Sequence, residues 1–247
     1  MNIGMYQSAA SLSALERWQD AVAQNITSSQ VTGYRKRTVE FSAMAGGEWN
    51  LASAGEGQTT VAAQFPKATN AINFQGGESA PTQRDLDVAI QGEGFFELQT
   101  PDGGKAYSRS GEFKIGADRI LTNTAGAQVM SDSGSTITLL STGGKVTINE
   151  DGTIKQGEVS IGKLAVMKFS STNDLRPVAG GLFVSGTGED PTTVDKPTLL
   201  QGYLEASNVT PMREMVDMVL ISRSYEANQK IIKTADEQMQ KTLDALG

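Results

Sequence analysis

The sequence contains no cysteine and no histidine. Without cysteine the chain can form neither a disulfide framework nor a thiolate metal site. Without histidine it lacks Ser-His-Asp and Cys-His nucleophile systems, and also the most common metal ligand. An enzyme with this sequence would have to use carboxylates, lysines or tyrosines. We therefore expect no catalytic residue, no metal site and no cofactor-binding residue.

Basic clusters and long apolar runs are also scarce. Across 247 residues the formal net charge is −7, and the only basic cluster is Arg35-Lys36-Arg37, which we interpret as a solvated patch. A phosphate backbone needs clustered Lys and Arg, so we expect no nucleic-acid partner. No stretch approaches the ~20 apolar residues of a membrane span, and the first residues do not resemble a cleaved signal peptide. We expect no direct membrane insertion.

The N-terminal segment, residues 1–41, has the pattern of an amphipathic helix. Between residues 4 and 28 there is no proline and no further glycine, and Gly33 follows as a termination signal. The apolar residues recur with heptad spacing; they are Met5, Leu12, Leu15, Val22 and Ile26. No neighbouring segment in the sequence covers this stripe, so the helix needs a partner.

The middle of the chain has two different compositions. Residues 42–82 combine many glycines with Ala, Ser, Thr and Gln, which predicts an extended linker with one short strand over residues 60–65. Residues 83–197 contain short alternating segments, such as residues 86–90, separated by turn signals such as Asp151-Gly152. This punctuation is typical of an all-β domain.

The last segment, residues 198–247, returns to a helical pattern. Thr210 is expected as the N-cap and Pro211 as the first helical residue. No glycine or proline follows until residue 247, and one apolar stripe contains Val216, Leu220, Ile231, Met239 and Leu243. The predicted fold class is therefore α+β, with N- and C-terminal α-helices that form a coiled-coil-like layer and a central all-β domain.

Other candidate sites have simpler interpretations. Gly92-Glu93-Gly94 lacks the remaining glycine and the following helix of a dinucleotide-binding loop. The acidic pairs Asp85/Asp87 and Glu150/Asp151 are explained by the solubility of turns and edge strands. Tyr225 is better explained as a packed helix residue than as a proton donor.

The two terminal stripes allow two interpretations, a hairpin of two helices within one chain or assembly between chains. The predicted C-terminal helix is much longer than the N-terminal one, so part of its stripe would stay uncovered within one chain, which favours assembly. We expect the assembly interface to consist of Leu12, Leu15, Val22, Ile26, Val216, Leu220, Ile231, Met239 and Leu243.

Four segments resemble the axial proteins of the bacterial flagellum, which comprise rod, hook and hook-associated subunits. They lie at residues 25–35, 85–96, 107–113 and 201–236. The residues that carry the resemblance include Asn25, Gly33, Tyr34, Gly92, Gly94, Phe95, Phe96, Ser207, Asn208, Tyr225, Glu226 and Asn228.

The resemblance implies a structural subunit of the basal-body rod that polymerises through paired terminal helices into a helical tube and transmits torque. Its partners would be copies of itself, other rod proteins and the flagellar type III export apparatus, with no small-molecule substrate. It would lie in the basal body, in the periplasm after export. Proximal rod proteins are the most similar group, and distal rod or hook proteins are alternatives. Outside the family, a secreted β-rich binding or adhesive protein and a carboxylate-based hydrolase remain as alternatives.

Overall fold

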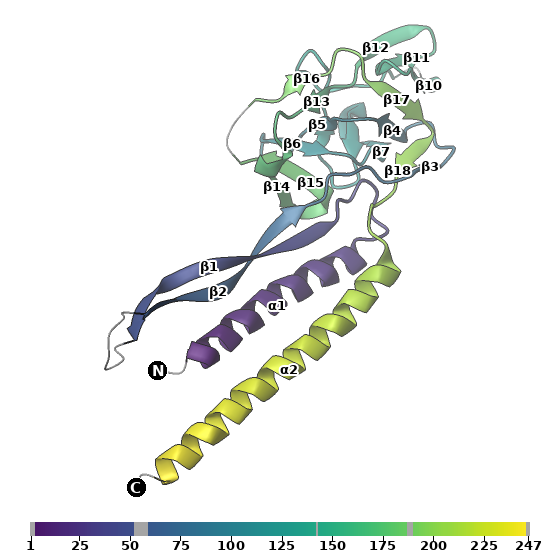
Figure 1. Ribbon diagram of the computed structural model, residues 1–247. Coiled ribbons are helices and arrows are strands. Elements are labelled where there is room, and N and C mark those ends of the chain that lie inside the picture. The colour runs from purple at the N-terminus through teal and green to yellow at the C-terminus, as the bar shows by residue number, and fades with distance from the viewer. Residues whose placement is uncertain (1–2, 52–58, 142, 187–189, 246–247) are drawn as a thin grey trace. The chain divides into compact units, whose positions relative to one another are not determined.

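A computed structural model describes residues 3–51, 59–141, 143–186 and 190–245 (Figure 1). The chain forms two compact units, and each unit combines segments that are distant in sequence. The helical unit consists of Met1–Thr27, Arg37–Asn73 and Thr210–Gly247, and the β unit consists of Ser28–Lys36 and Phe74–Val209.

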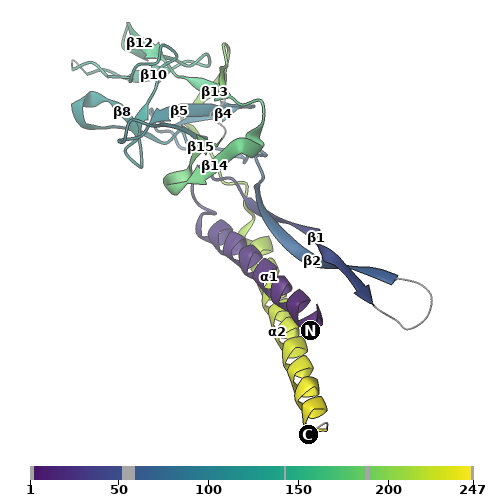
Figure 2. The same cartoon turned by 90° about the vertical axis from the view of Figure 1, so that its left-hand side faces the viewer.

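The helical unit contains two long helices and one long hairpin. Helix α1 spans Ile3–Thr27 and α2 spans Pro211–Asp244, while strands β1 (Arg37–Leu51) and β2 (Thr59–Ile72) pair antiparallel from Arg37↔Ile72 to Leu51↔Thr59. Helix α1 contacts both α2 and the hairpin, and α1 and α2 run alongside each other in both views (Figures 1 and 2).

Small side chains allow α1 to pack closely. Ala14, Ala21 and Val22 are buried in this unit, and the absence of bulky groups at two of these positions lets neighbouring backbone approach the helix. Trp18 contacts the edge of Phe41 in β1, with 5.7 Å between ring centroids. The helix is thus held on the hairpin by this aromatic contact and by a hydrogen bond from Arg17 Nη1 to the Ala68 carbonyl oxygen at 3.0 Å.

The β unit is built from short strands. The strands are β3 (Ser79–Pro81), β4 (Val88–Gln91), β5 (Phe95–Gln99), β6 (Lys105–Ser108), β7 (Phe113–Ile115), β8 (Leu121–Asn123), β9 (Gln128–Val129), β10 (Val146–Ile148), β11 (Thr153–Gln156), β12 (Val159–Lys163), β13 (Val166–Lys168), β14 (Leu175–Val178), β15 (Leu182–Ser185), β16 (Thr192–Thr193), β17 (Thr198–Gln201) and β18 (Tyr203–Glu205). Three 3-10 helices lie at Ala117–Arg119, Thr172–Asp174 and Ala179–Gly181.

The largest sheet has the order β14-β15-β6-β5-β9-β8-β7, with β13 paired to both β5 and β16. A separate sheet has the order β10-β11-β12, and two further pairs join β17 to β4 and β18 to β3. Fully buried side chains from several of these sheets form one core that includes Phe96, Leu98, Phe113, Leu121, Ile154 and Leu199. The strands therefore share a single interior, although they belong to separate ladders.

The α+β arrangement with a helix near each end and a β-rich middle is confirmed. Residues 42–82, predicted as an extended linker with one short strand over residues 60–65, are mostly extended, and β2 contains that strand. They pair in the β1–β2 hairpin, which is followed by β3, and so are more ordered than a linker. The adjacent glycines at 46 and 47 that suggested a linker lie at a register shift between Ala45 and Glu48. Such a bulge inserts extra residues without ending the strand pair.

Candidate functional site

One face of α2 carries large apolar side chains that are exposed. Val216 is 54% exposed, Leu220 47% and Ile231 56%. Met212, Met215 and Val219 are exposed on the same side. We call these six residues the apolar face of α2. Exposed apolar surface of this kind is typical of protein–protein contact sites. Met239 is also exposed, but it lies five turns after Ile221 and therefore on the opposite side of the helix.

A different face of α2 packs inside the helical unit. Glu214 and Ile221 are almost completely buried, at 0% and 1% exposed, and Asn228, Ile232 and Ala235 are partly buried. These positions are spaced by three, four or seven residues, which places them on one side of a helix. Helix α2 therefore has two sides with separate roles, one buried within the chain and one facing outward.

The residues predicted for the assembly interface divide between these two environments. In α1, Val22 is buried and Leu12, Leu15 and Ile26 are partly buried. In α2, the four predicted residues Val216, Leu220, Ile231 and Met239 are exposed, and the side chain of Leu243 lies outside the described part. The helices do pack on each other within one chain, yet this leaves the predicted stripe of α2 open. Its role in assembly stays a prediction.

Asn25 joins three elements of the helical unit. Its Nδ2 donates to Oε2 of Glu214 at 2.9 Å and to the carbonyl oxygen of Arg37 at 2.8 Å, while its Oδ1 accepts from the Arg37 backbone N–H at 2.8 Å. Asn25 is 0% exposed. Because the amide supplies both donor and acceptor, it satisfies the start of β1 and the buried carboxylate of α2 at once.

Gly33 lies where the chain passes close to another backbone segment of the β unit. Its φ is +68°, and a Cβ there would lie 2.4 Å from the backbone nitrogen of Ser110. Its N–H donates to the Glu205 carbonyl oxygen at 2.8 Å. Both the dihedral angle and the close approach require glycine. Tyr34, the next motif residue, is buried.

Asn208 fixes the segment that follows Gly33. Its Oδ1 accepts from the Lys36 N–H at 2.7 Å, and its Nδ2 donates to the Gln75 carbonyl oxygen at 2.9 Å. Ser207 contributes a local turn, since its Oγ accepts from the Val209 N–H at 3.2 Å. These two motif residues therefore hold three separate stretches of the β unit together.

A buried ion cluster lies beside this segment. Glu205 Oε1 accepts from Arg35 Nη2 at 2.7 Å, and its Oε2 accepts from Arg109 Nε at 2.9 Å. The interpretation of Arg35 as part of a solvated patch is wrong, because it is 3% exposed. Burial lowers the pKa of Arg35 from its ordinary value, against the opposing effect of the Glu205 carboxylate, and the charge of Arg109 lowers it further.

The glycine–phenylalanine motif forms the other wall of this cluster. Gly92 and Gly94 both have positive φ, and their carbonyl oxygens accept from Arg109 Nη2 at 2.9 Å and Nη1 at 2.6 Å. Phe95 contacts three other rings, those of Phe74, Phe169 and Phe183. Phe96 packs edge-on against Phe113 in the core, with ring centroids 5.1 Å apart. The motif is thus a turn that presents carbonyls to an arginine, not a phosphate loop.

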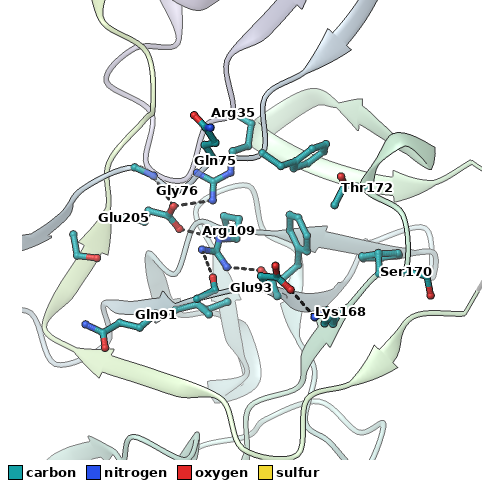
Figure 3. Close-up of a pocket in the computed structure, with 18 residues that line it drawn as sticks. Arg35, Gln75, Gly76, Gln91, Glu93, Arg109, Lys168, Ser170, Thr172 and Glu205 are labelled. Atoms are coloured by element: carbon teal, nitrogen blue, oxygen red, sulfur yellow. Dashed lines mark hydrogen bonds and ion pairs between the residues drawn. The ribbon is translucent and has the colours of Figure 1, made fainter.

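These residues surround a pocket of about 840 Å³ (Figure 3). Arg35, Arg109 and Glu205 lie at one side of it, and Phe74, Phe95 and Phe169 add an apolar wall. Lys168 and Glu93 form an exposed ion pair at the rim, 2.5 Å apart. This pair and the buried cluster give the pocket a charged character that sequence reasoning did not predict.

The remaining candidate residues have structural surroundings. Tyr225 is partly buried and Glu226 is exposed on α2, and Asn228 Nδ2 donates to the Ser224 carbonyl oxygen one turn earlier. The interpretation of Asp87 as a solubilising turn residue is wrong. It is 0% exposed and its carboxylate lies 3.6 Å from Arg84 Nε.

Over the described residues, no group of three or more Asp or Glu side chains is placed to hold a metal ion. In the same part of the chain, neither helix is long and apolar enough to cross a membrane.

The Asn25–Glu214 contact and the Arg35–Glu205–Arg109 cluster were missed from the sequence. The available signal was that these charged residues lie inside the segments that carry the family resemblance. The sequence around a charged residue gives little indication that the residue is buried. Its burial depends on a partner that is distant in sequence.

Comparison with known proteins agrees with these motifs. Residues 200–245 match the family described as flagellar basal body rod FlgEFG protein C-terminal, and residues 89–156 match the flagellar hook protein FlgE/F/G D1 domain. The chain is 32% identical to the flagellar basal-body rod protein FlgF of Caulobacter vibrioides, over 100% of this chain and 99% of that protein. It is 28% identical to FlgG of Borreliella burgdorferi over 95% of each chain. It is 35% identical to FlgG of Buchnera aphidicola subsp. Acyrthosiphon pisum over 71% of this chain and 70% of that protein.

Proposed function

The chain belongs to the family of flagellar basal-body rod proteins, and on that premise we propose that it polymerises through the apolar face of α2, which binds the terminal helices of neighbouring subunits. As a member of this family it is a structural subunit of the flagellar basal-body rod and not an enzyme. The observation that carries the proposal is the exposure of Val216, Leu220 and Ile231 on a helix whose other side is already packed.

The size of the apolar face supports a contact with another protein chain. Complete burial of one Val, Leu, Ile or Met side chain contributes about 1.5–3 kcal/mol, and about half of that remains to be gained at these half-exposed positions. Association costs about 4–15 kcal/mol in lost translational and rotational freedom. Burial of the six side chains by a neighbouring helix therefore contributes a favourable free energy of the same order as this cost.

We infer that the apolar face of α2 on one subunit contacts a different surface of the terminal helices on the next subunit. A contact between different surfaces of identical subunits is heterologous, and it produces an open helical array when the rotation does not close. We infer that the paired terminal helices form a coiled-coil-like layer in such an array. Repetition of the contact would distribute torque over many subunits.

Two further parts of the proposal concern delivery and position. We propose that the subunit travels through the flagellar type III export apparatus as an unfolded chain. Because the chain has no cysteine, it cannot form incorrect disulfides when it reaches an oxidising compartment. We also propose a proximal position in the rod, in line with the full-length match to a FlgF protein. Distal rod and hook positions remain the alternatives.

The experiment that tests the proposal uses single substitutions on α2. In a strain that lacks the chromosomal copy, Leu220→Asp and Ile231→Asp should prevent incorporation into purified basal bodies and abolish motility. Gln229→Asp, at an exposed polar position of the same helix, should assemble normally. Circular dichroism of the purified variants should match that of the unsubstituted chain. Normal incorporation of both variants would overturn the proposal.

A further inference from the structure

The pocket of the β unit contains more positive than negative groups. Its positively charged lining residues are Arg35, Arg109 and Lys168, and its negatively charged lining residues are Glu93 and Glu205. Lys168 and Glu93 pair with each other at the rim. In the interior, two guanidinium groups share the single carboxylate of Glu205. The interior therefore has an excess of one positive charge.

The two arginines differ in how their N–H groups are used. Arg109 donates from Nε to Glu205, from Nη1 to the Gly94 carbonyl and from Nη2 to the Gly92 carbonyl. Arg35 donates from Nη2 to Glu205, whereas its Nε and Nη1 have no hydrogen-bond partner among the described residues. Its side chain is 1% exposed. The excess charge and the unused donors therefore belong to the same residue.

Buried donors without an acceptor and buried charges without a counter-charge are both unfavourable. An anionic acceptor in the pocket would correct both defects. A carboxylate fits because it brings one negative charge, and because the rings of Phe74, Phe95 and Phe169 offer an apolar wall for the aliphatic part of an acidic side chain. A multiply charged group such as a phosphate would leave an excess of negative charge.

We propose that this pocket binds the carboxylate of an Asp or Glu side chain from a neighbouring rod subunit. The proposal rests on the function proposed above, since it needs a neighbour in an assembled rod. Acidic side chains are abundant on the chain itself, which has 28 Asp and Glu against 21 Lys and Arg. A second copy of the chain can therefore supply the ligand.

Because Arg35 is buried, a side chain at the rim has to move before a ligand reaches its guanidinium. Gln75 is exposed and is drawn beside Arg35 in Figure 3. Lys168 is 55% exposed and lies at the entrance, where it would meet the incoming carboxylate first.

The position of Lys168 allows a direct test by cross-linking. A carbodiimide activates a carboxylate, and a lysine amine then displaces the urea to form an amide bond. Glu93→Gln removes the rim carboxylate that Lys168 would otherwise join, and it changes no buried residue. Basal bodies purified from a strain with this variant are treated with a water-soluble carbodiimide, and the cross-linked peptides are identified by mass spectrometry.

We expect an amide bond between Lys168 and an Asp or Glu of another subunit. Lys155 on β11 is exposed and lies outside the pocket, so it should give several-fold less intersubunit product. A second substitution, Arg35→Met, should lower the Lys168 product several-fold while circular dichroism reports an intact fold. If Arg35→Met fails to fold, the comparison of Lys168 with Lys155 still decides the question.

The possible outcomes separate this inference from the proposed function. If the chain is present in the rods and Lys168 forms only intrachain products or none, the pocket does not bind a neighbouring carboxylate, although the assembly proposal stands. If Lys168 and Lys155 react equally, the pocket has no selective role and the inference is also overturned. If the chain is absent from purified rods, both proposals fail.

Discussion

The side-chain amide of Asn25 donates a 2.9 Å hydrogen bond to the carboxylate of Glu214, which lies 189 positions further along the chain. Both side chains are 0% exposed. The contact ties the last turns of α1 to the first turn of α2, and the same amide also binds the backbone at the start of β1. One neutral side chain therefore fixes three elements at the place where they converge.

Asn25→Asp should destabilise the helical unit by more than about 2 kcal/mol. The substitution removes the donor and places a second carboxylate beside Glu214, and a buried unsatisfied charged group costs more than the ~1–3 kcal/mol of a neutral one. Thermal unfolding followed by helical circular dichroism measures the effect, with Gln19→Ala on the exposed side of α1 as control. Glu214→Gln added to Asn25→Asp should recover part of the loss, because it restores a donor–acceptor pair. Absence of any recovery would count against the contact.

Truncation of two adjacent residues on α2 should change the stability of the chain by very different amounts. Ile221 is 1% exposed, so Ile221→Ala should destabilise the chain by about 2–5 kcal/mol. Leu220 is 47% exposed, so Leu220→Ala should change the stability of the isolated chain by no more than about 0.5 kcal/mol. Denaturant unfolding of the isolated chain compares the two. Equal effects would mean that the two faces of α2 are not distinct.

The buried ion cluster should tolerate the loss of Arg35 better than the loss of Glu205. Glu205→Gln leaves two buried guanidinium groups without a carboxylate, which should cost about 3–5 kcal/mol. Arg35→Met leaves Arg109 and Glu205 as a balanced pair, so the cost should stay below about 2 kcal/mol. Denaturant unfolding of the two variants gives the order directly. A larger loss for Arg35→Met would contradict the assignment of excess charge to Arg35.

Gly33→Ala should be more destabilising than Gly126→Ala. Both glycines have positive φ, at +68° and +86°, so both substitutions introduce backbone strain of about 1 kcal/mol. Only Gly33 also faces a neighbouring backbone, where a Cβ would lie 2.4 Å from the Ser110 nitrogen, whereas nothing lies within 4 Å of a Cβ at Gly126. The difference in melting temperature between the two variants isolates the steric contribution. Identical values would show that the close approach relaxes freely.

Stability should decrease at alkaline pH. Burial raises the pKa of Tyr107, and a hydrogen bond from Lys105 to Glu97 raises the pKa of Lys105. The folded chain therefore retains these protons to higher pH than the unfolded chain, so the free energy of unfolding falls as the pH rises above about 10. Tyr107→Phe should make this decline shallower in denaturant titrations between about pH 8 and pH 11, and Tyr203→Phe, at an exposed tyrosine, serves as the matched substitution. An unchanged slope for Tyr107→Phe would contradict the assignment.

The helices were predictable because their signals are local. Absence of glycine and proline, together with Thr210-Pro211 at the start of α2, marks both helical segments from neighbouring residues alone. The hairpin was not predictable in the same way. Its strands contain glycine and small polar residues, and their stability comes from pairing such as Phe41↔Ala68 and from packing on Trp18. In the hairpin, contacts between residues that are distant in sequence determine the structure, because the local preference of these residues for a strand is weak.

The site residues were only partly predictable for a related reason. Periodicity found Val216, Leu220 and Ile231 of the apolar face of α2, but it placed Met239, which lies in line with the buried Ile221, in the same stripe. It missed the packed face, whose most buried residue is the charged Glu214. Arg35 was assigned to solvent because its neighbours in sequence are basic, whereas its environment is set by Glu205, which is 170 positions away. Burial of a charged side chain depends on such a distant counter-charge, so it produces no periodic pattern in the sequence.

The composition of the two units has a mechanical consequence. The backbone passes from one unit to the other at four places, between residues 27 and 28, 36 and 37, 73 and 74, and 209 and 210. Four peptide connections in parallel carry any pulling or twisting force that passes between the units, where a simple tandem arrangement would have one. A single proteolytic nick at any of these crossings would divide the chain into two fragments, but three backbone connections between the units would remain.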